Sequence, residues 1–427
     1  MSCFGSMEAI APDKAAPTKI LRAYKTELDP NNARRTLLLK HAGARRWAYN
    51  WGLRKKIQEY ERAGKSPDAQ TLHRELVLLK NTDPLEGGVP WMYEVSKCAP
   101  QEALWDLDEA FQNFFRRVKE GRKPGFPRFK SKKRGIGGFR LTGTIKVFER
   151  HLQLPRLGRI RLKERGYLPF RDPTVHILSA TVTERAGRWF VSLQVEMEIE
   201  QVPPKEAAVG VDVGISALAT LSDGKKFENP RTLLGAERKL KLLQRSISRK
   251  RKGSKNRQKA VRKLAKAHAR VANLRENVLH EISSAIAKRF GIVGMEDLNA
   301  EGMGRNPRLA KALKDAAFGE LRRQVEYKTS WNGGRVVLVD RFYPSSRTCS
   351  GCKKVKEHLG LSERIFRCDT CGLVIDRDQN AALNLKDVAA SDTETKNACG
   401  GDGRPRRGRQ FPRKQEPNAD VGDVLLG

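Results

Sequence analysis

The sequence predicts a multidomain α/β protein. Its 427 residues can hold two to four domains of about 100–200 residues each. Short runs with two-residue hydrophobic spacing fill residues 139–202, which is typical of small β-structures. From residue 208 onward, buried strands alternate with long helices, and two C-x₂-C pairs near residue 360 indicate a metal-binding insertion.

The net charge of the protein limits the kinds of partner that we expect it to bind. Lys and Arg number 84 against 49 acids, a formal net charge of +35. Such a charge opposes folding through self-repulsion, so we expect a polyanion to offset it. Nucleic acid is the first candidate and an anionic membrane surface the second. No apolar run approaches the roughly 20 residues of a membrane span, and no signal-peptide hydrophobic region is evident, so we expect a cytosolic protein.

The N-terminal third predicts a helical domain inserted between strands. Residues 1–18 are expected to be a flexible leader, and residues 19–28 alternate like a strand. Helices are expected at about 31–43, 44–63 and 68–80, with a long one from Ser96. In that last helix a stripe of apolar residues includes three phenylalanines that we expect in the core: Phe111, Phe114 and Phe115.

Two stretches of this helical domain combine aromatic or breaker residues with basic ones. Trp47 and Trp51 lie among arginines and lysines, so they either stack on bases or belong to a core. Residues 121–134 hold four glycines and prolines and several basic residues, including Arg128 and Lys130. We expect an extended loop that lies on a phosphate backbone.

A small β-barrel is expected to surround this insertion in the sequence. Five or six short strands are predicted in residues 136–204, and the strand at 19–28 joins them. The predicted runs lie at 144–147, 152–154, 159–162, 174–178, 180–184 and 189–198.

The third region begins with a buried strand that contains Asp212 in its middle, followed by a tight turn and a strand at 217–221. RNase H-like nucleases begin in this way, although an ordinary strand whose Asp caps a turn gives the same pattern. A hairpin of two long basic helices follows at 235–290, then a strand ending at Glu296, a helix at about 306–328 and a strand at 335–340. The hairpin is either a solvated charged face or a polyanion groove, and its one-sided charge favours the groove.

Four cysteines predict a structural zinc site. Cys349 and Cys352 form one C-x₂-C pair, and Cys368 and Cys371 form the second after a gap of fifteen residues. This spacing is typical of a zinc ribbon, whereas two disulfides or four unrelated thiols are the alternatives. The other cysteines, Cys3, Cys98 and Cys399, are expected to be free thiols.

Three carboxylates predict a second metal site. Asp212, Glu296 and Asp378 are each flanked by apolar or small residues, so each can face inward. Inward acids in so basic a protein are explained by divalent cations, Mg²⁺ or Mn²⁺, because two such ions clamp the attacking and leaving oxygens of a phosphodiester. Asp376 is the competing acid in the last block.

These blocks resemble a known family. The segments around the three acids, Gly210-Val-Asp212-Val-Gly-Ile, Gly294-Met-Glu296-Asp-Leu and Asp376-Arg-Asp378-Gln-Asn-Ala-Ala-Leu-Asn384, are similar to the RuvC motifs of the TnpB family. These are transposon-encoded RNA-guided nucleases related to type V CRISPR nucleases. The ribbon, Phe342-Tyr-Pro-Ser-Ser before it and Gly125-Phe-Pro-Arg-Phe-Lys130 also match, and the similarity spans about residues 19 to 387.

The resemblance implies a domain plan. We expect a wedge β-barrel at 19–28 and 136–204, a helical recognition domain at 29–135, and a RuvC (RNase H-like) nuclease domain at 205–345 and 372–388. A zinc ribbon at 346–371 is inserted in the nuclease domain, and residues 389–427 form a disordered tail. The implied protein is a prokaryotic, cytoplasmic enzyme, associated with the nucleoid when on DNA, without a membrane or obligate protein partner.

The resemblance also implies partners and contacts. A guide RNA from the transposon end would pair with target double-stranded DNA, while the protein reads a short adjacent motif through Thr71, Lys97 and Gln101. Basic contacts are expected from Arg128 and Lys130 and, at the hairpin, from Arg249, Lys250, Arg251 and Lys252. The alternatives are a DNA-binding repressor without cleavage, or a transposase or transposase-accessory protein.

Overall fold

The computed structural model describes residues 18–169, 172–199, 206–360 and 362–398. Most of the expected leader, the tail beyond residue 398, Cys3 and Cys399 lie outside these residues. Within them, no helix combines the length and apolar character that crossing a membrane requires.

The first sheet has seven strands in the order β2-β6-β7-β1-β5-β4-β3. Its strands are β1 (Thr18–Asp29), β2 (Gly138–Leu141), β3 (Lys146–Val147), β4 (His151–Leu154), β5 (Gly158–Leu162), β6 (His176–Arg185) and β7 (Arg188–Ile199). All pairings are antiparallel, and β1 lies between β7 and β5, which explains the two-part sequence of this unit. Among the described residues no hydrogen-bonded pairing joins β2 to β3, so the order is open rather than a closed barrel.

The strand boundaries correct the sequence prediction at two places. The runs expected at 174–178 and 180–184 form the single strand β6, which carries an irregularity between Ile177 and Ser179. Strand β2 was not predicted as a separate run. Apolar side chains of the sheet share one core, which includes Leu28, Phe139, Leu152, Val182 and Leu193.

The helical module consists of α1 (Asn32–Ala63), α2 (Ala69–Asn81) and α3 (Cys98–Lys119), with the short 3₁₀ turns η1 (Pro84–Glu86), η2 (Pro90–Glu94) and η3 (Lys132–Arg134). The prediction of two helices at 31–43 and 44–63 was wrong, because α1 is continuous. Its first half packs through Leu38 on the sheet core, and its second half packs through Leu53 on a separate core with α2 and α3. Because each half of α1 packs on its own core, the helix continues from one core to the other without a break.

The aromatic residues of this module divide differently from the prediction. Phe115 is 61% exposed, so its expected core position was wrong. Phe111 and Phe114 are half-buried and contact Phe126 edge-on. Trp47 and Trp51 stack on each other at 6.0 Å and pack partly buried against the helical core.

The second sheet has five strands in the order β10-β9-β8-β11-β12. Its strands are β8 (Glu206–Asp212), β9 (Ala217–Leu221), β10 (Lys226–Glu228), β11 (Phe290–Glu296) and β12 (Arg335–Val339). Strands β8, β11 and β12 are parallel, whereas β9 and β10 are antiparallel additions to β8. The carboxyl ends of β8 and β11 therefore lie at one edge of the sheet.

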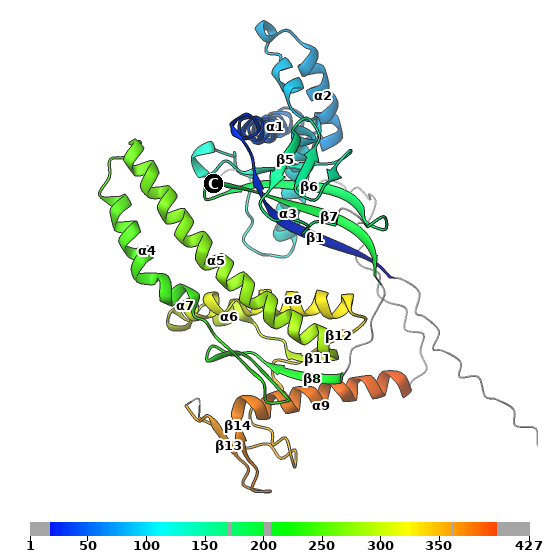
Figure 1. The fold of residues 1–427 in the computed structure, drawn as a ribbon, viewed down its shortest axis with the longest axis vertical. Helices are drawn as coiled ribbons and strands as arrows, with labels where there is room; N and C mark the ends of the chain where they lie inside the picture. The colour runs from blue at the N-terminus through cyan, green and yellow to red at the C-terminus, as the bar shows by residue number, and fades with distance from the viewer. Residues whose placement is uncertain (1–17, 170–171, 200–205, 361, 399–427) are drawn as a thin grey trace, which may run out of the picture.

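Helices cover both faces of this sheet. The helices of this region are α4 (Thr232–Ser248), α5 (Lys255–Arg289), α6 (Ala300–Met303), α7 (Pro307–Ala316), α8 (Phe318–Trp331) and α9 (Arg377–Ala398). Helices α5 and α8 lie on one face and α9 on the other, and the α4–α5 hairpin projects away from the sheet (Figure 1). The helix expected at 306–328 is broken at Ala317, whose φ of 52° is left-handed. Helix α9 continues to Ala398, ten residues beyond the expected end at 388.

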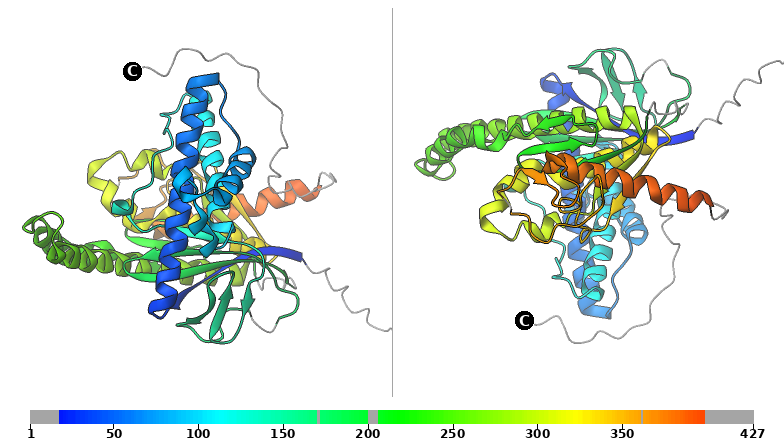
Figure 2. Two further views of the ribbon diagram at one scale, coloured as in Figure 1. Left: turned by 90° about the horizontal axis from the view of Figure 1, so that it is seen from above. Right: turned by 90° about the horizontal axis from the view of Figure 1, so that it is seen from below.

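A small third sheet of β13 (Ile365–Arg367) and β14 (Val374–Asp376) precedes α9. Figures 1 and 2 show the helical module α1–α3 at one end of the molecule and this small sheet with α9 at the other.

Candidate active site and metal centre

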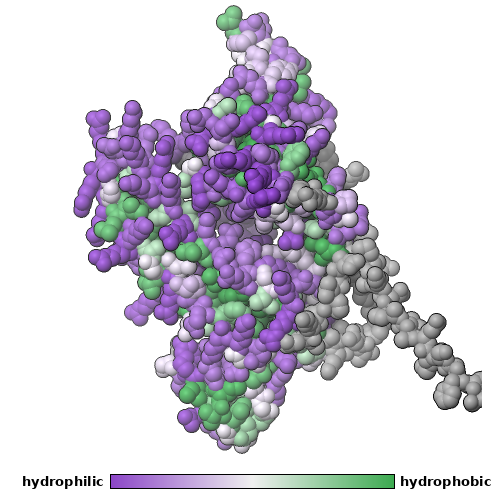
Figure 3. Space-filling view, viewed as in Figure 1, coloured by the Kyte–Doolittle hydropathy of each residue, from purple (hydrophilic) through white to green (hydrophobic). Residues whose placement is uncertain are grey.

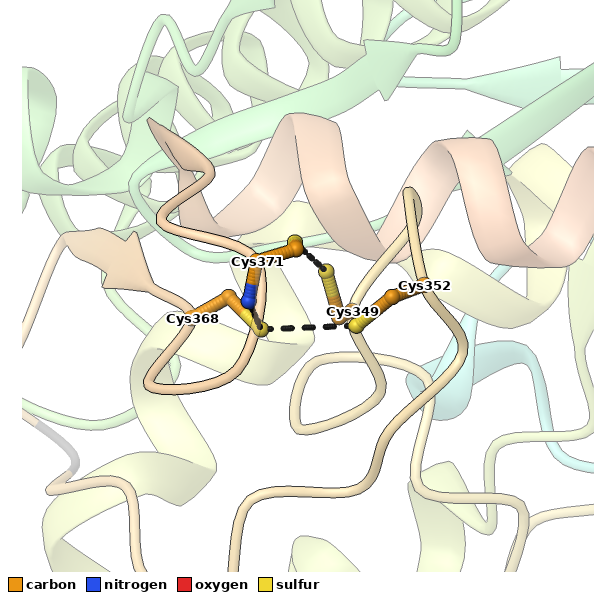
Figure 4. Close-up of side chains that lie close together, drawn as sticks. All are labelled: Cys349, Cys352, Cys368 and Cys371. Atoms are coloured by element: carbon orange, nitrogen blue, oxygen red, sulfur yellow. Dashed lines mark hydrogen bonds between the residues drawn. The ribbon is translucent and has the colours of Figure 1, made fainter.

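The four predicted cysteines form one cluster. Their sulfur atoms all lie within 4.8 Å of one another, with 3.5 Å from Cys349 to Cys371 and 3.5 Å from Cys352 to Cys368. Figure 4 shows the four thiols pointing toward a common centre. A disulfide requires about 2.05 Å between sulfurs, so the structure contains four free thiols and not two disulfides.

The surroundings of the cluster favour a thiolate at Cys368 but not at Cys371. The backbone of Leu373 lowers the pKa of Cys371, but the neighbouring thiols of Cys349 and Cys368 outweigh it and raise this pKa to about 12. The amide of Cys371 donates to Sγ of Cys368 at 3.5 Å, and backbone amides of Cys371 and Thr370 are the main cause that lowers the pKa of the Cys368 thiol to about 6. Four thiolate donors at this spacing match the tetrahedral S₄ set that structural zinc takes. The cluster can therefore hold one metal ion.

Two buried asparagines attach this cysteine module to α9. Asn380 accepts from the amide of Ser350 at 2.9 Å and donates to the carbonyl of Thr348 at 2.7 Å. Asn384 donates to the carbonyls of Ser345 and Thr348 at 2.9 and 2.6 Å. Neither side chain is exposed, so their polarity is explained by hydrogen bonding and not by metal binding.

Asp376 and Asp378, two residues apart at the start of α9, have different partners. One oxygen of Asp376 accepts from the amides of Asp378 and Gln379 at 3.0 and 3.1 Å, and the other pairs with Lys226 at 2.7 Å. Asp376 therefore caps the helix. Asp378 contacts Arg377 at 3.4 Å, and its side chain is 22% exposed.

Asp212 and Glu296 are the last residues of β8 and β11. Asp212 does not lie in mid-strand as expected, because β8 ends with it. Val211 is paired with Met295 in the parallel register, so the next residues, Asp212 and Glu296, meet at the same edge. Burial and then the charges of Asp378 and Glu296 raise the pKa of Asp212 to about 7, and burial raises the pKa of Glu296.

The three carboxylates are less tightly gathered than the cysteines. In the described part of the chain, only the cysteines bring three or more ligand atoms within 4.8 Å of one another. The acids are still close enough for Asp378 and Glu296 to act on the Asp212 carboxyl. Carboxylate oxygens suit cations such as Mg²⁺, which keep several of their waters.

A pair of glycines sets the distance between α9 and the sheet. A Cβ on Gly210 would lie 1.8 Å from the carbonyl oxygen of Ala382, and one on Gly294 would lie 2.4 Å from that of Leu385. These glycines are register partners on β8 and β11. Both glycines belong to the motifs around the acids, but this packing role was not predicted from the sequence. The signal was a glycine two residues before each acid, in an otherwise apolar strand.

The predicted nucleic-acid contacts lie on other surfaces. Thr71 and Lys97 are exposed, and Gln101 is half-buried near the start of α3. Arg128 and Lys130 are exposed, and the backbone of Lys130 is held by the amide group of Asn50 at 2.7 and 2.9 Å.

The tip of the α4–α5 hairpin carries the remaining predicted contacts. Arg249, Arg251 and Lys252 are exposed there, and Lys250 is half-buried. This hairpin forms a hydrophilic projection in Figure 3, whereas apolar residues gather over the cysteine module, where Val355, Ile365 and Val374 are exposed.

Comparisons with known proteins identify the class. A family model described as "Probable transposase" (OrfB_IS605) matches residues 191–306, and one described as "Cas12f1-like, TNB domain" matches residues 318–385. A third, "Helix-turn-helix domain", matches residues 19–65, where the structure has β1 and the single helix α1.

Relatives along the whole chain identify the family. A Streptomyces pristinaespiralis protein named "Putative RNA-guided DNA endonuclease" is 35% identical, covering 95% of this chain and 98% of its own. The InsQ protein of Escherichia coli K12, similarly named, is 34% identical over 93% and 98%. The chain belongs to the TnpB family. The structure of a mini-RNA-guided CRISPR endonuclease, Cas phi3, is similar with a TM-score of 0.46 at 9% identity, covering 89% of this chain and 93% of its own.

Proposed function

We propose that this protein is an RNA-guided double-stranded DNA endonuclease of a transposon, which cuts phosphodiester bonds at a metal-dependent RuvC site. The observation that carries the proposal is that Asp212 and Glu296 end neighbouring parallel strands at one edge of the second sheet, with Asp378 near enough to raise the pKa of Asp212. The names of its full-length relatives support the RNA-guided reaction.

The three carboxylates would hold Mg²⁺ or Mn²⁺. Such ions, when bound, stabilise the charge that develops on the attacking and leaving oxygens of a phosphodiester. The raised pKa of Asp212 fits this role, because a cluster of acids without a cation favours protonation of one member. The protein itself fixes the acids on two strand ends and one helix start, elements that move little.

The domain plan belongs to the same proposal. The RuvC domain would comprise residues 205–345 and 372–388, and its sheet of antiparallel and then parallel strands supports an RNase H-like assignment. The zinc ribbon corresponds to residues 346–371, whose cysteine cluster would bind one Zn²⁺. Residues 19–28 and 136–204 would form the wedge domain, and residues 29–135 the recognition domain.

Guide RNA is the proposed source of sequence specificity. The +35 charge exceeds what a short DNA segment requires, and basic residues occur in all three regions. Pairing of a guide with one DNA strand would select the target, while Thr71, Lys97 and Gln101 read a short duplex motif beside it. Arg128, Lys130 and the hairpin tip with Arg249, Lys250, Arg251 and Lys252 would contact phosphates.

The test is cleavage of one plasmid by protein carrying matched RNA, mismatched RNA or no RNA. We expect site-specific cutting only with matched RNA and Mg²⁺. Equal site-specific cutting in all three reactions would contradict guidance and leave a conventional endonuclease or transposase. Motif-dependent binding without any cutting would favour a repressor instead.

A further inference from the structure

The helical module buries two lysines whose surroundings differ. Lys56 is 5% exposed and pairs with Asp108 at 2.7 Å, and it donates to the carbonyl of Pro67 at 2.5 Å. Lys80 is 7% exposed, and the described residues give its ammonium no acid or carbonyl partner. The Nζ of Lys80 is not among the buried polar atoms that lack a partner, so its stem is buried while its ammonium stays accessible to a ligand.

Lys80 occupies a position at which the helix pattern calls for an apolar residue. The buried residues of α2 are Ala69, Leu72, Leu76 and Lys80, a stripe with helical spacing. Desolvation lowers the pKa of Lys80. The C-terminal end of α2 favours a cation there, but a helix dipole offsets only a small part of such a desolvation.

Lys80 lines a cavity of about 600 Å³. This cavity lies between η2, the start of α3 and the turn that joins β4 to β5, and it is also lined by Lys97 and Arg156. Among the described residues, no acidic side chain lines it. Lys80 and Lys97 together lower the pKa of the neighbouring His73, after desolvation, so the positive potential extends beyond the cavity wall.

We propose that Lys80, Lys97 and Arg156 form a site for one backbone phosphate of duplex DNA. Three cations without an acid make an anion site, and the cavity is large enough for a phosphate group with its sugar. Hydroxyl and amide donors of the wall, including Thr144 and Gln153, can complete the hydrogen bonds.

DNA is the preferred source of the phosphate because Lys97 belongs to both the cavity and the surface proposed to read the duplex. This choice rests on the proposed function. Phosphate contacts position a protein on DNA without reading sequence, so this site, with Lys97 in it, would fix the register from which Gln101, one turn further along α3, reaches base edges.

The experiment compares Lys80→Met with Lys56→Met, since both variants remove one positive charge and keep most of the apolar stem. Thermal unfolding of the protein is measured first. Lys80→Met should change the melting temperature little, because its ammonium has no ion-pair partner among the described residues, whereas Lys56→Met should lower it by leaving Asp108 without its cation.

Binding is then measured for the protein–guide RNA complex on duplex DNA at several salt concentrations without added divalent ions. Lys80→Met should weaken binding to all DNA sequences similarly and reduce the slope of log K against log salt by about 0.9. Lys56→Met should leave that slope unchanged. Binding of the guide RNA to free protein is measured in the same way.

Unchanged slopes for both DNA and RNA would overturn the phosphate site. A reduced slope for RNA alone would overturn the choice of DNA. Absence of guided cleavage by the parent protein would defeat the proposed nuclease but not this test, because the slopes are measured without cleavage.

Discussion

The cysteine cluster and the three carboxylates are linked in the sequence, because Asp378 follows Cys371 closely, yet the two groups are built differently. The cysteines come from two tight turns within 23 residues of sequence, and their sulfurs lie within 4.8 Å of one another. The carboxylates come from three elements spread over 167 residues, and they do not form so tight a group. One site depends on local turns and the other on the register of a sheet.

The difference determines what can disturb each site. The ribbon would keep its metal as long as its two turns form, whatever happens in the sheet. The carboxylates need β8, β11 and α9 to stay in register, so changes far from the acids should affect them. Asn380 and Asn384 join the cysteine module to α9, the helix that carries Asp378.

Removal of zinc should have the largest effect. Structural zinc contributes on the order of 10 kcal/mol of apparent binding free energy to small ribbons, so chelation should unfold this module. Cleavage should also fall, because Asn384 attaches the start of the cysteine module to α9, and the first turn of this helix contains Asp378. Metal analysis should give one zinc per chain, unchanged in Cys98→Ser, whose thiol lies outside the cluster. Well under one zinc, with four free thiols, would contradict the assignment.

Gly210→Ala should separate the two sites. The added Cβ would meet backbone atoms of Ala382 and Lys386 at 1.8 and 2.5 Å, so α9 must move, at a cost of about 3 kcal/mol or more. Cleavage should be lost while zinc stays bound. Gly235→Ala is the control, because its Cβ meets nothing within 4 Å and a helical alanine should slightly stabilise α4. Equal melting temperatures of the two variants would refute the close contact.

Asp378→Asn should reduce guided cleavage at least about 100-fold, because the proposed metal site loses a charged ligand. DNA binding and zinc content should not change. Without divalent ions the variant should be no less stable than the parent, since a like charge beside Asp212 is removed. Asp369→Asn, at an acid whose side chain is 76% exposed in the ribbon, is the control. Parental cleavage by Asp378→Asn would exclude this residue from the site.

Asn384→Ala should weaken the connection between the sites. The carbonyl of Ser345 loses a buried donor, which costs about 1–3 kcal/mol. Zinc should remain, and hydrogen exchange should increase around residues 345–350. Asn277→Ala, which removes only an exposed contact with Glu281, should leave exchange unchanged. An equal exchange pattern in both variants would show that Asn384 does not hold the ribbon.

Lys226→Met should have the smallest effect. The pair with Asp376 is partly exposed, and such pairs contribute about 1 kcal/mol or less. Because Asp376 still caps α9 through backbone amides, cleavage should fall no more than about fivefold. A loss as large as that of Asp378→Asn would mean that Asp376 takes part in the chemistry and does more than cap the helix.

The sequence was sufficient where a feature depends on neighbouring residues. The cysteine spacing predicted a cluster, and the hydrophobic patterns predicted most strands and the long helices. The family was confirmed by relatives over nearly the whole chain. Metal occupancy and the roles of the three acids stay predictions, although the structure brings their side chains near one another.

Features that depend on contacts between residues far apart in the sequence could not be predicted from it. Nothing around Ala317 indicates a break, which arises where α7 turns into α8 against the sheet core. The exposure of Phe115 depends on how far α3 extends beyond its partners. The asparagines of α9 were recognised as unusual, but their carbonyl partners 30 or more residues away could not be inferred from spacing.

The position of α9 has a consequence for synthesis on the ribosome. This helix follows every other described element in the chain, and it covers β8 and β11 and brings Asp378 to their ends. Until it has emerged, one face of the five-stranded sheet has no cover and the third acid is missing. Because domains form as the chain grows, the N-terminal sheet and helices can fold early, while the proposed active site stays incomplete until translation has passed α9.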